Sequence, residues 1–281
     1  MISIIGLGIT GSAIQESFTN KQIQQKNYDK YKNIGKIEDC LNSVIIFLCL
    51  PTPFNQEKNE YNKDPIYDVL DKLEHYKYDG VIVLKSTVEP NTTNELYDRY
   101  KLKHHFNLVH NPEFLSSSTA YKDFHNQPHI VLGRHKECYL EQFKKVELFY
   151  KKYYSNSEIS ICFSNESESM KIFLNSFYAS KIQLFNEYYL LCKKTGINYE
   201  NVKGLMLKNN WINPMHTNVP GTDGKLSYGG MCFPKDTNAL NNFMKQHNSA
   251  NLIIESTIKE QKLIRNIDYK KEIINKQANL E

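Results

Sequence analysis

The first eleven residues constrain the fold of this chain more than any other stretch. An apolar run, Ile2–Ile5, leads directly into Gly6-x-Gly8-x-x-Gly11, and an amphipathic stretch follows. In such a strand–turn–helix context the first glycine permits a tight turn, the second lets the backbone approach a pyrophosphate, and the third lets helix and strand pack closely. The sequence therefore predicts a Rossmann-type domain that holds a dinucleotide at the N-terminus of its first helix.

An acidic residue further along favours NAD over NADP. Asp29 lies 18 residues after Gly11, near the place expected for a carboxylate that binds the ribose hydroxyls. The alternative is a solvated aspartate in the polar run Tyr28–Tyr31. The chain between Asp29 and Val44 is short, so we expect this part of the domain to be smaller than in a complete Rossmann-type domain. The turn supplies further candidate cofactor-binding residues: Gly6, Gly8, Ile9, Thr10 and Gly11.

The first half of the chain alternates short apolar runs with amphipathic ones. We expect strands at Ile2–Ile5, Val44–Leu50, Val81–Leu84, Asn107–Val109 and Ile130–Leu132. We expect helices at Gly11–Phe18, Ile66–Leu73 and Thr93–Tyr100. Apolar strands separated by helices indicate α/β architecture, in which a parallel sheet is covered on both faces. The polar segment Phe54–Pro65 is expected to form a surface loop.

From about Glu158 the pattern becomes helical. After one short strand, Ile159–Phe163, apolar residues recur at three- and four-residue spacing from about Ser167 to Lys194. We expect shorter helices at Glu200–Leu207, Pro234–Lys245 and Ala250–Ile264. The sequence thus predicts an NAD-binding domain over 1–155, an all-helical domain over 156–268 and a polar tail over 269–281.

Composition argues against several classes of protein. The net charge of +4 comes from lysines scattered among acids, without the clustered basic face that nucleic-acid binding needs. No apolar run approaches the ~20 residues of a membrane helix, and the first residues already form an expected strand, so we predict neither a membrane span nor a leader peptide. The six cysteines show no C-x-x-C pair and no histidine at metal spacing, so we expect no metal, no disulfide and a reducing, cytoplasmic compartment.

Four separated segments carry residues suited to chemistry: Pro51-Thr52-Pro53, Lys85-Ser86-Thr87-Val88, Asn111-Pro112-Glu113-Phe114-Leu115 and Gly229–Asp236. The first three follow expected strands, where ligands bind in open α/β sheets. In the fourth, Cys232 precedes Pro234, a favourable first-turn residue, so we expect the thiol at a helix N-terminus. The helix dipole and the neighbouring Lys235 would favour the thiolate. The alternative is a buried structural thiol.

The long helix adds a cation and an amide at matching positions. Lys171 and Asn175 are four residues apart and so share a helix face. A cation beside an amide donor is what a developing oxyanion needs. The alternative for Lys171 is a solvated helix lysine. Asp236 lies four residues from Cys232, about one helical turn away.

Together with Gly6–Gly11, these segments resemble the UDP-glucose/GDP-mannose dehydrogenase family, in order from Met1 to about Arg265. The resemblance implies a middle domain like that of 6-phosphogluconate dehydrogenase. It also implies NAD-dependent oxidation of a nucleotide sugar's C6 alcohol to a carboxylate in two steps, with UDP-glucose the first expectation. Cys232 would form a thiohemiacetal and then a thioester. Lys171 and Asn175 would hold the oxyanion, and Asp236 would orient or activate water.

The resemblance implies roles for further residues. Thr87 would help place the water beside the nicotinamide, Glu113 would act as acid or base or position the sugar, and Lys235 would approach the cofactor phosphates. Pro51, Thr52 and Ser86 join the candidate cofactor-binding residues. The candidate substrate-binding residues are Glu113, Phe114, Leu115, Lys171, Asn175, Tyr228 and Gly229. The long helix would pair two subunits; the alternative for its apolar and aromatic residues is a core within one chain.

Two departures from the family pattern keep other functions open. Ser117 stands where the family usually has a second glutamate after the Asn111–Leu115 segment, and we expect these 281 residues to hold no counterpart of the family's C-terminal nucleotide-binding domain. One alternative is therefore a catalytically silent module that binds NAD or dimerises with a full-length relative. Another is a two-domain dehydrogenase of a small hydroxy acid. Cys232 argues against that second alternative, because a single oxidation needs no covalent intermediate.

Overall fold

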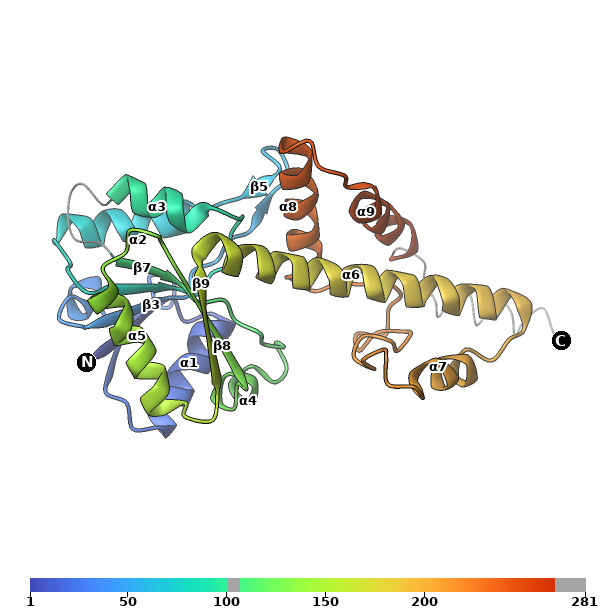
Figure 1. Ribbon diagram of the computed structural model, residues 1–281, viewed down its shortest axis with the longest axis horizontal. Helices are drawn as coiled ribbons and strands as arrows, with labels where there is room; N and C mark the ends of the chain where they lie inside the picture. The colour runs from blue at the N-terminus through green and yellow to red at the C-terminus, as the bar shows by residue number, and fades with distance from the viewer. Residues whose placement is uncertain (101–106, 266–281) are drawn as a thin grey trace. The chain divides into compact units, whose positions relative to one another are not determined.

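The computed structural model describes residues 1–100 and 107–265, and Figure 1 shows its helices and strands. The chain forms two compact units, each described here by itself. The first comprises residues 1–55 and 61–171, and the second comprises residues 56–60 and the described chain from 172 onward. The expected polar tail, 269–281, lies outside the described residues.

The first unit is built on a seven-stranded sheet in the order β2-β1-β3-β6-β7-β8-β9. The strands are β1 (Ile2–Ile5), β2 (Gln25–Tyr28), β3 (Ile45–Leu48), β6 (Val81–Leu84), β7 (Asn107–His110), β8 (His129–Arg134) and β9 (Glu158–Phe163). Neighbouring strands are parallel, as the sequence predicts, except that β7 and β8 are antiparallel, with Val109 opposite Arg134. The short pair β4 (Phe54–Asn55) and β5 (Glu60–Tyr61) lies within the expected surface loop.

The strand sequences follow from their places in the sheet. Every residue of β1, β3 and β6 is buried, which is why their residues are apolar on both faces, except for Ser3 in β1, whose hydroxyl is bonded to Ser43. Strand β2 escaped prediction because its sequence, Gln25–Tyr28, is mostly polar. It lies at the sheet edge, and its register is set by pairing with β1, where Tyr28 is opposite Ile5.

Helices cover both faces of this sheet (Figure 1). On one face, α1 (Ile9–Asn20), α4 (Ala120–His125) and α5 (Leu140–Tyr153) contribute to a core in which Phe18, Phe47 and Phe149 meet. On the other face, α2 (Asp64–His75), α3 (Thr92–Tyr100) and the 3-10 helix η1 (Ile37–Cys40) supply a second core. Sequence analysis identified α1, α2 and α3 but not α4 or α5.

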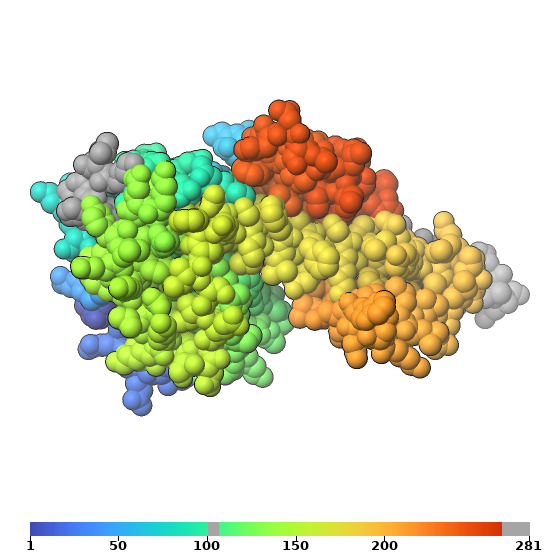
Figure 2. Space-filling model, in the orientation of Figure 1, coloured from blue at the N-terminus to red at the C-terminus, as the bar shows by residue number. Residues whose placement is uncertain are grey.

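The second unit consists of helices, as expected. Helix α6 (Ser164–Thr195, 32 residues) begins in the first unit and continues into the second, where Gly196 at φ +77° follows its end. It is joined by α7 (Tyr199–Leu207), α8 (Phe233–Gln246) and α9 (Leu252–Ile264), and Figure 2 shows α8 and α9 against one side of α6. No helix in the described part of the chain is both long enough and apolar enough to cross a membrane.

The division between the units falls later than the expected boundary near residue 155. Strand β9 pairs with β8 along its full length and so remains in the sheet. The first turns of α6 are also held there, because Ser164 bonds Asn94 and Ser167 bonds His110. The first unit therefore extends to Lys171. The sequence could not predict this, because a change in local composition does not reveal sheet pairing or these hydrogen bonds.

Candidate functional site

The glycine turn after β1 has the geometry that its spacing predicts. Gly6 has φ +90°, and a Cβ there would lie 2.5 Å from the Cys49 carbonyl oxygen. A Cβ on Gly11 would lie 1.8 Å from the Gly6 carbonyl oxygen, so helix and turn can meet only at a glycine. Around Gly8, in contrast, nothing lies within 4 Å of a built Cβ. That open space beside the N-terminus of α1 fits a pyrophosphate group.

Asp29 ties the end of β2 to this turn. Its Oδ2 accepts the Leu7 N–H at 2.7 Å, and its Oδ1 accepts the N–H groups of Tyr31 and Lys32 at 2.9 Å each. Burial raises the pKa of Asp29, but the backbone donors outweigh it and the pKa is lowered, so the carboxylate is ionised at neutral pH. The solvated-aspartate alternative is wrong, because Asp29 is buried. Its contact with a ribose stays a prediction.

The segments after β3 and β6 lie side by side and are bonded to each other. Ser86 Oγ donates to the Leu50 carbonyl at 2.7 Å and accepts the Leu50 N–H at 3.2 Å. Thr52 Oγ1 donates to the Thr87 carbonyl at 2.7 Å. Pro51 is exposed, Thr52 and Ser86 are buried, and Thr87 is half-buried. The predicted cofactor-binding residues of these two segments thus occupy one edge, at the carboxyl ends of adjacent parallel strands.

Buried Lys171 and half-buried Glu113 form an ion pair beside that edge. Lys171 Nζ donates to the Glu113 carbonyl at 2.5 Å and lies 3.2 Å from its Oε1. Glu113 Oε2 accepts the Leu115 N–H at 2.6 Å, and the Lys171 ammonium lies 5.4 Å from the centre of the Phe114 ring. Lys171 is 4% exposed, so the solvated-lysine alternative is wrong.

Two buried titratable residues near this pair were not among the predicted site residues. Lys85 Nζ donates to Asn111 Oδ1 at 2.9 Å, and burial lowers the pKa of Lys85 to about 8. Glu168 accepts hydrogen bonds from Asn91 N–H, Thr93 N–H and Thr93 Oγ1, yet burial raises its pKa to about 8. The signal for Lys85 was a lysine placed directly after a wholly apolar strand. The sequence carries no comparable signal for Glu168.

Cys232 lies where Pro234 predicts it. It is the N-cap residue of α8, follows Gly230 at φ +77°, and is exposed, so the buried structural thiol is wrong. One turn further, Asp236 is fully buried. Exposed sulfur and buried carboxylate are thus placed on the same first turn of one helix.

The carboxylate of Asp236 joins two other predicted residues. Its Oδ2 accepts a hydrogen bond from Asn175 Nδ2 at 2.6 Å, and its Oδ1 pairs with Lys235 Nζ at 2.5 Å. From the sequence we expected Asn175 to bind an oxyanion and Lys235 to approach the cofactor phosphates. In this structure both side chains donate to the Asp236 carboxylate. Those two roles stay predictions.

The loop before Cys232 packs onto α9. Tyr228 is 2% exposed and its hydroxyl lies 3.5 Å from the Thr257 carbonyl, so its side chain has a packing role in the second unit. A Cβ on Gly229 would lie 2.2 Å from the Arg265 guanidinium. Arg265 also donates to the carbonyls of Leu226 and Ser227 at 3.0 and 3.1 Å. The guanidinium of Arg265, a residue that sequence reasoning had not singled out, thus packs directly against Gly229.

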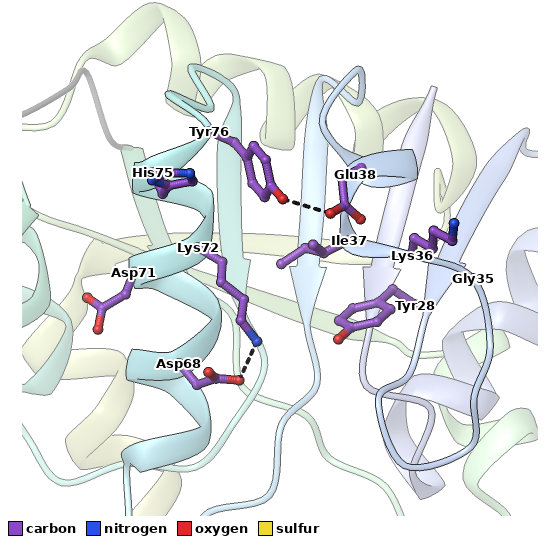
Figure 3. Close-up of a pocket in the computed structure, with 10 residues that line it drawn as sticks. All are labelled: Tyr28, Gly35, Lys36, Ile37, Glu38, Asp68, Asp71, Lys72, His75 and Tyr76. Atoms are coloured by element: carbon purple, nitrogen blue, oxygen red, sulfur yellow. Dashed lines mark hydrogen bonds and ion pairs between the residues drawn. The ribbon is translucent and has the colours of Figure 1, made fainter.

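A groove of about 520 Å³ lies on the first unit, between η1 and α2 (Figure 3). Across it Tyr76 donates to Glu38 Oε1 at 2.7 Å, while Lys72 pairs with Asp68 on the same helix at 2.9 Å. It opens where the chain after Asp29 is short and folds only into η1. No predicted site residue lines it. Its lining residues are Tyr28, Gly35, Lys36, Ile37, Glu38, Asp68, Asp71, Lys72, His75 and Tyr76.

Two parts of the chain match models of known protein domains. Residues 9–153 match the NAD binding domain of the UDP-glucose/GDP-mannose dehydrogenase family, and residues 165–261 match the central domain of the same family.

Individual proteins give the same likeness. A UDP-glucose 6-dehydrogenase of Rickettsia felis is 34% identical over 245 residues, which are 86% of this chain and 52% of that protein. A UDP-glucose dehydrogenase structure from Pyrobaculum islandicum has a TM-score of 0.82 at 21% identity, covering 93% of this chain and 68% of the other. The 3-hydroxyisobutyrate dehydrogenase of Mycobacterium tuberculosis has a TM-score of 0.71 at 11% identity and is covered to 95%, as is this chain. At such identities the two structures show a shared fold. The chain spans about half the length of the curated relatives it matches.

Proposed function

Because this chain belongs to the UDP-glucose/GDP-mannose dehydrogenase family, we propose that it oxidises the C6 alcohol of UDP-glucose to a carboxylate with NAD. The observation that carries the proposal is the first turn of α8. There an exposed Cys232 and a fully buried Asp236 are one turn apart, and Asn175 and Lys235 both bond the carboxylate. Packing alone does not call for an exposed cysteine one helical turn before a buried aspartate whose carboxylate is bonded to two side chains.

The first unit fits the cofactor that the family's NAD-binding domain implies. NAD, when bound, accepts one hydride in each of the two oxidations. The open space at Gly8 and the N-terminus of α1 would hold its pyrophosphate, and the ionised Asp29 would accept hydrogen bonds from a ribose. Pro51, Thr52, Ser86 and Thr87 would line the edge beside it.

Cys232 would hold the substrate between the two oxidations. Its sulfur adds to the aldehyde carbon, and the carbonyl oxygen takes a proton, which gives a thiohemiacetal. After the second hydride has left that carbon and the proton has left its oxygen, a thioester remains. Water then adds to the thioester carbon, the C–S bond breaks, and the products are a carboxylate and the thiol. The position at the N-terminus of α8 favours the thiolate that the first addition needs.

The neighbouring polar residues would stabilise charge on the substrate oxygen and activate water. Lys171 and Asn175 lie one turn apart on α6, so an ammonium and an amide donor share a helix face. Donors of this kind stabilise an oxyanion as it forms. Asp236, held by Asn175 and Lys235, would accept a proton from the attacking water. Glu113, which orients Lys171, would position the sugar or transfer a proton.

We further propose that α6 pairs two copies of the chain. A stripe of large apolar side chains on this helix is exposed, with exposed fractions between 37% and 61%. Its members are Phe173, Phe177, Leu184, Tyr188 and Leu191. Their separations of three, four and seven residues place them on one helix face, the pattern of a helix that packs against a partner. An apolar stripe of this length is unfavourable in water and favours a partner surface.

The test follows NADH formation by absorbance with UDP-glucose, for the wild type and Cys232→Ser. We expect two NADH per UDP-glucose from the wild type and loss of this complete oxidation in the variant, because serine cannot replace the thiolate as nucleophile. NAD binding by the variant, measured by calorimetry, serves as the control and should match the wild type.

Two outcomes would replace the proposal. Oxidation of a small hydroxy acid at a rate indifferent to Cys232→Ser would assign the chain to a single-step dehydrogenase. NAD binding without turnover of UDP-glucose or GDP-mannose would make it a binding module.

A further inference from the structure

Lys85, the residue directly after β6, is one of the largest fully buried side chains in the described chain. Its Nζ donates to Asn111 Oδ1 at 2.9 Å, lies 3.5 Å from the Pro112 carbonyl oxygen, and is 5.5 Å from the centre of the Phe124 ring. Among the residues that the structure describes, no carboxylate forms an ion pair with it. A buried ammonium held by neutral oxygens costs desolvation free energy, so fold stability does not explain its presence.

The charges around Lys85 do not balance. Lys85 and Lys171 are both buried. The carboxylate of Glu113 attracts the Lys85 ammonium and also forms an ion pair with Lys171. Two positive charges therefore face one negative charge. Burial raises the pKa of Cys49 to about 12 and lowers that of His110 to about 3, so both are neutral at pH 7. Burial likewise lowers the pKa of Lys85 to about 8. The cluster therefore carries an excess positive charge that depends on Lys85.

The bonds of Lys85 are made to the segment that carries Glu113. Asn111 and Pro112 directly follow β7, and proline contributes no N–H that could hold this segment in place. Asn111 Oδ1 accepts hydrogen bonds from both Lys85 and Tyr150, the latter at 2.5 Å, so donors from two other parts of the chain hold this segment. The next residue is Glu113, which bonds Lys171 through both its carbonyl and its carboxylate.

We propose that Lys85 is a positioning residue for the oxidation. Its ammonium holds the Asn111–Pro112 segment, this segment sets the place of Glu113, and Glu113 sets the place of the Lys171 ammonium. Lys85 itself touches neither substrate nor cofactor in this proposal. The role rests on the proposed function, because it matters for catalysis only if Lys171 stabilises the substrate oxygen.

The test compares Lys85→Met with the wild type. Methionine fills the buried space without a charge, so the variant should melt at or above the wild-type temperature at pH 7. Its kcat for UDP-glucose should fall roughly 10²-fold, as small misplacements of a charged group can cost, while NAD affinity stays within about twofold because Lys85 does not contact NAD. A variant that melts lower but keeps the wild-type kcat would make Lys85 purely structural and overturn the proposal.

A second measurement does not depend on turnover. In protein labelled with ¹³C-lysine, the Lys171 signal is assigned by its loss in Lys171→Arg. We expect this signal to move in Lys85→Met, and in the wild type to shift with an inflection near pH 8 as Lys85 loses its proton. Tyr150→Phe removes the other donor to Asn111 Oδ1 but keeps the charge, so it should retain the inflection that Lys85→Met loses.

The outcomes separate the two proposals. If the wild type oxidises no nucleotide sugar, the proposed function fails and the Lys171 signal alone decides the role of Lys85. If that signal is identical in Lys85→Met and the wild type, or if its inflection persists in Lys85→Met, Lys85 does not position Lys171.

Discussion

At the residue scale, the three glycines of the first turn have three different surroundings. Gly6 and Gly11 face backbone oxygens so closely that a Cβ at either position would collide, whereas Gly8 faces open space. Gly6 and Gly11 are therefore required by the fold, whereas the fold leaves room for a side chain at Gly8, where we propose that the cofactor pyrophosphate lies. Substitutions within these six residues can therefore test the stability of the fold and the proposed cofactor binding separately.

Gly8→Ala should lower NAD affinity without lowering stability. The added methyl group meets no protein atom within 4 Å but occupies the space beside the N-terminus of α1. We expect the melting temperature to stay within a degree or two and NAD affinity, measured by calorimetry, to fall at least about tenfold, or ~1.4 kcal/mol. Gly11→Ala is the matched control and should destabilise the fold. Equal NAD affinity in Gly8→Ala and wild type would place the pyrophosphate elsewhere.

At the element scale, α6 belongs to both units, and different residues attach it to different partners. Near its start Glu168 caps α3 by accepting the N–H groups of Asn91 and Thr93 and the Thr93 hydroxyl. Further on, Phe185 and Cys192 pack in the core of the second unit. The exposed apolar stripe that begins at Phe173 lies on the same helix. One helix thus combines a capping bond, a core face and a face open to a partner.

Glu168 should make stability fall as pH rises. Burial raises its folded-state pKa from 4.5 to about 8, so between these values the folded chain binds a proton that the unfolded chain has lost. Its stabilising contribution is complete below pH 4.5 and is lost as pH rises through about 8, at up to about 1.4 kcal/mol per pH unit. Glu168→Gln removes this slope. Urea denaturation at pH 5 and pH 8 measures it, and parallel losses in both proteins would show that the folded Glu168 is already ionised.

Phe177→Glu should prevent pairing of two copies through α6. The side chain is 61% exposed within the proposed apolar stripe, so a carboxylate there adds two negative charges to a paired interface. We expect light scattering to give a dimer mass for the wild type and a monomer mass for the variant. Leu205→Glu on α7 makes the same change at a residue that is 65% exposed but off the stripe, and it should remain dimeric. A monomeric wild type would exclude the dimer.

At the scale of the whole molecule, two units share one continuous helix, and each contains different residues of the candidate site. The first unit contains the glycine turn, Asp29 and the Lys171–Glu113 pair. The second contains Cys232 and the Asn175–Asp236 bond. Since α6 cannot unfold in one unit without losing turns that continue into the other, we expect the two units to unfold together.

NAD should therefore stabilise the whole chain, although its proposed contacts, apart from that of Lys235, lie in the first unit. A ligand at 100 times its Kd stabilises the folded state by about 2.7 kcal/mol. We expect calorimetry to show one unfolding transition that moves to higher temperature with NAD. Two transitions, of which NAD moves one, would show that the units unfold independently.

The sequence by itself determined the features that local chemistry encodes. The glycine spacing identified the turn after β1, mostly apolar runs identified β1, β3 and β6, and three- and four-residue periodicity identified α6. Pro234 after Cys232 identified the helix N-terminus at the candidate nucleophile. Each of these signals lies within one turn, strand or helix, where steric and hydrogen-bonding preferences act between near neighbours.

The tertiary structure decided which side chains meet. The mostly polar segment β2 forms a strand because its backbone pairs with β1, and β9 belongs to the first unit because its backbone pairs with β8. Lys171 bonds a residue 58 positions away, Asn175 one that is 61 positions away, and Glu168 one that is 75 positions away. Such pairings depend on how the elements pack, and the burial that shifts the pKa values of Lys85 and Glu168 depends on the same packing. The sequence therefore identified candidate residues of the site, while packing determined their partners, their burial and their charge.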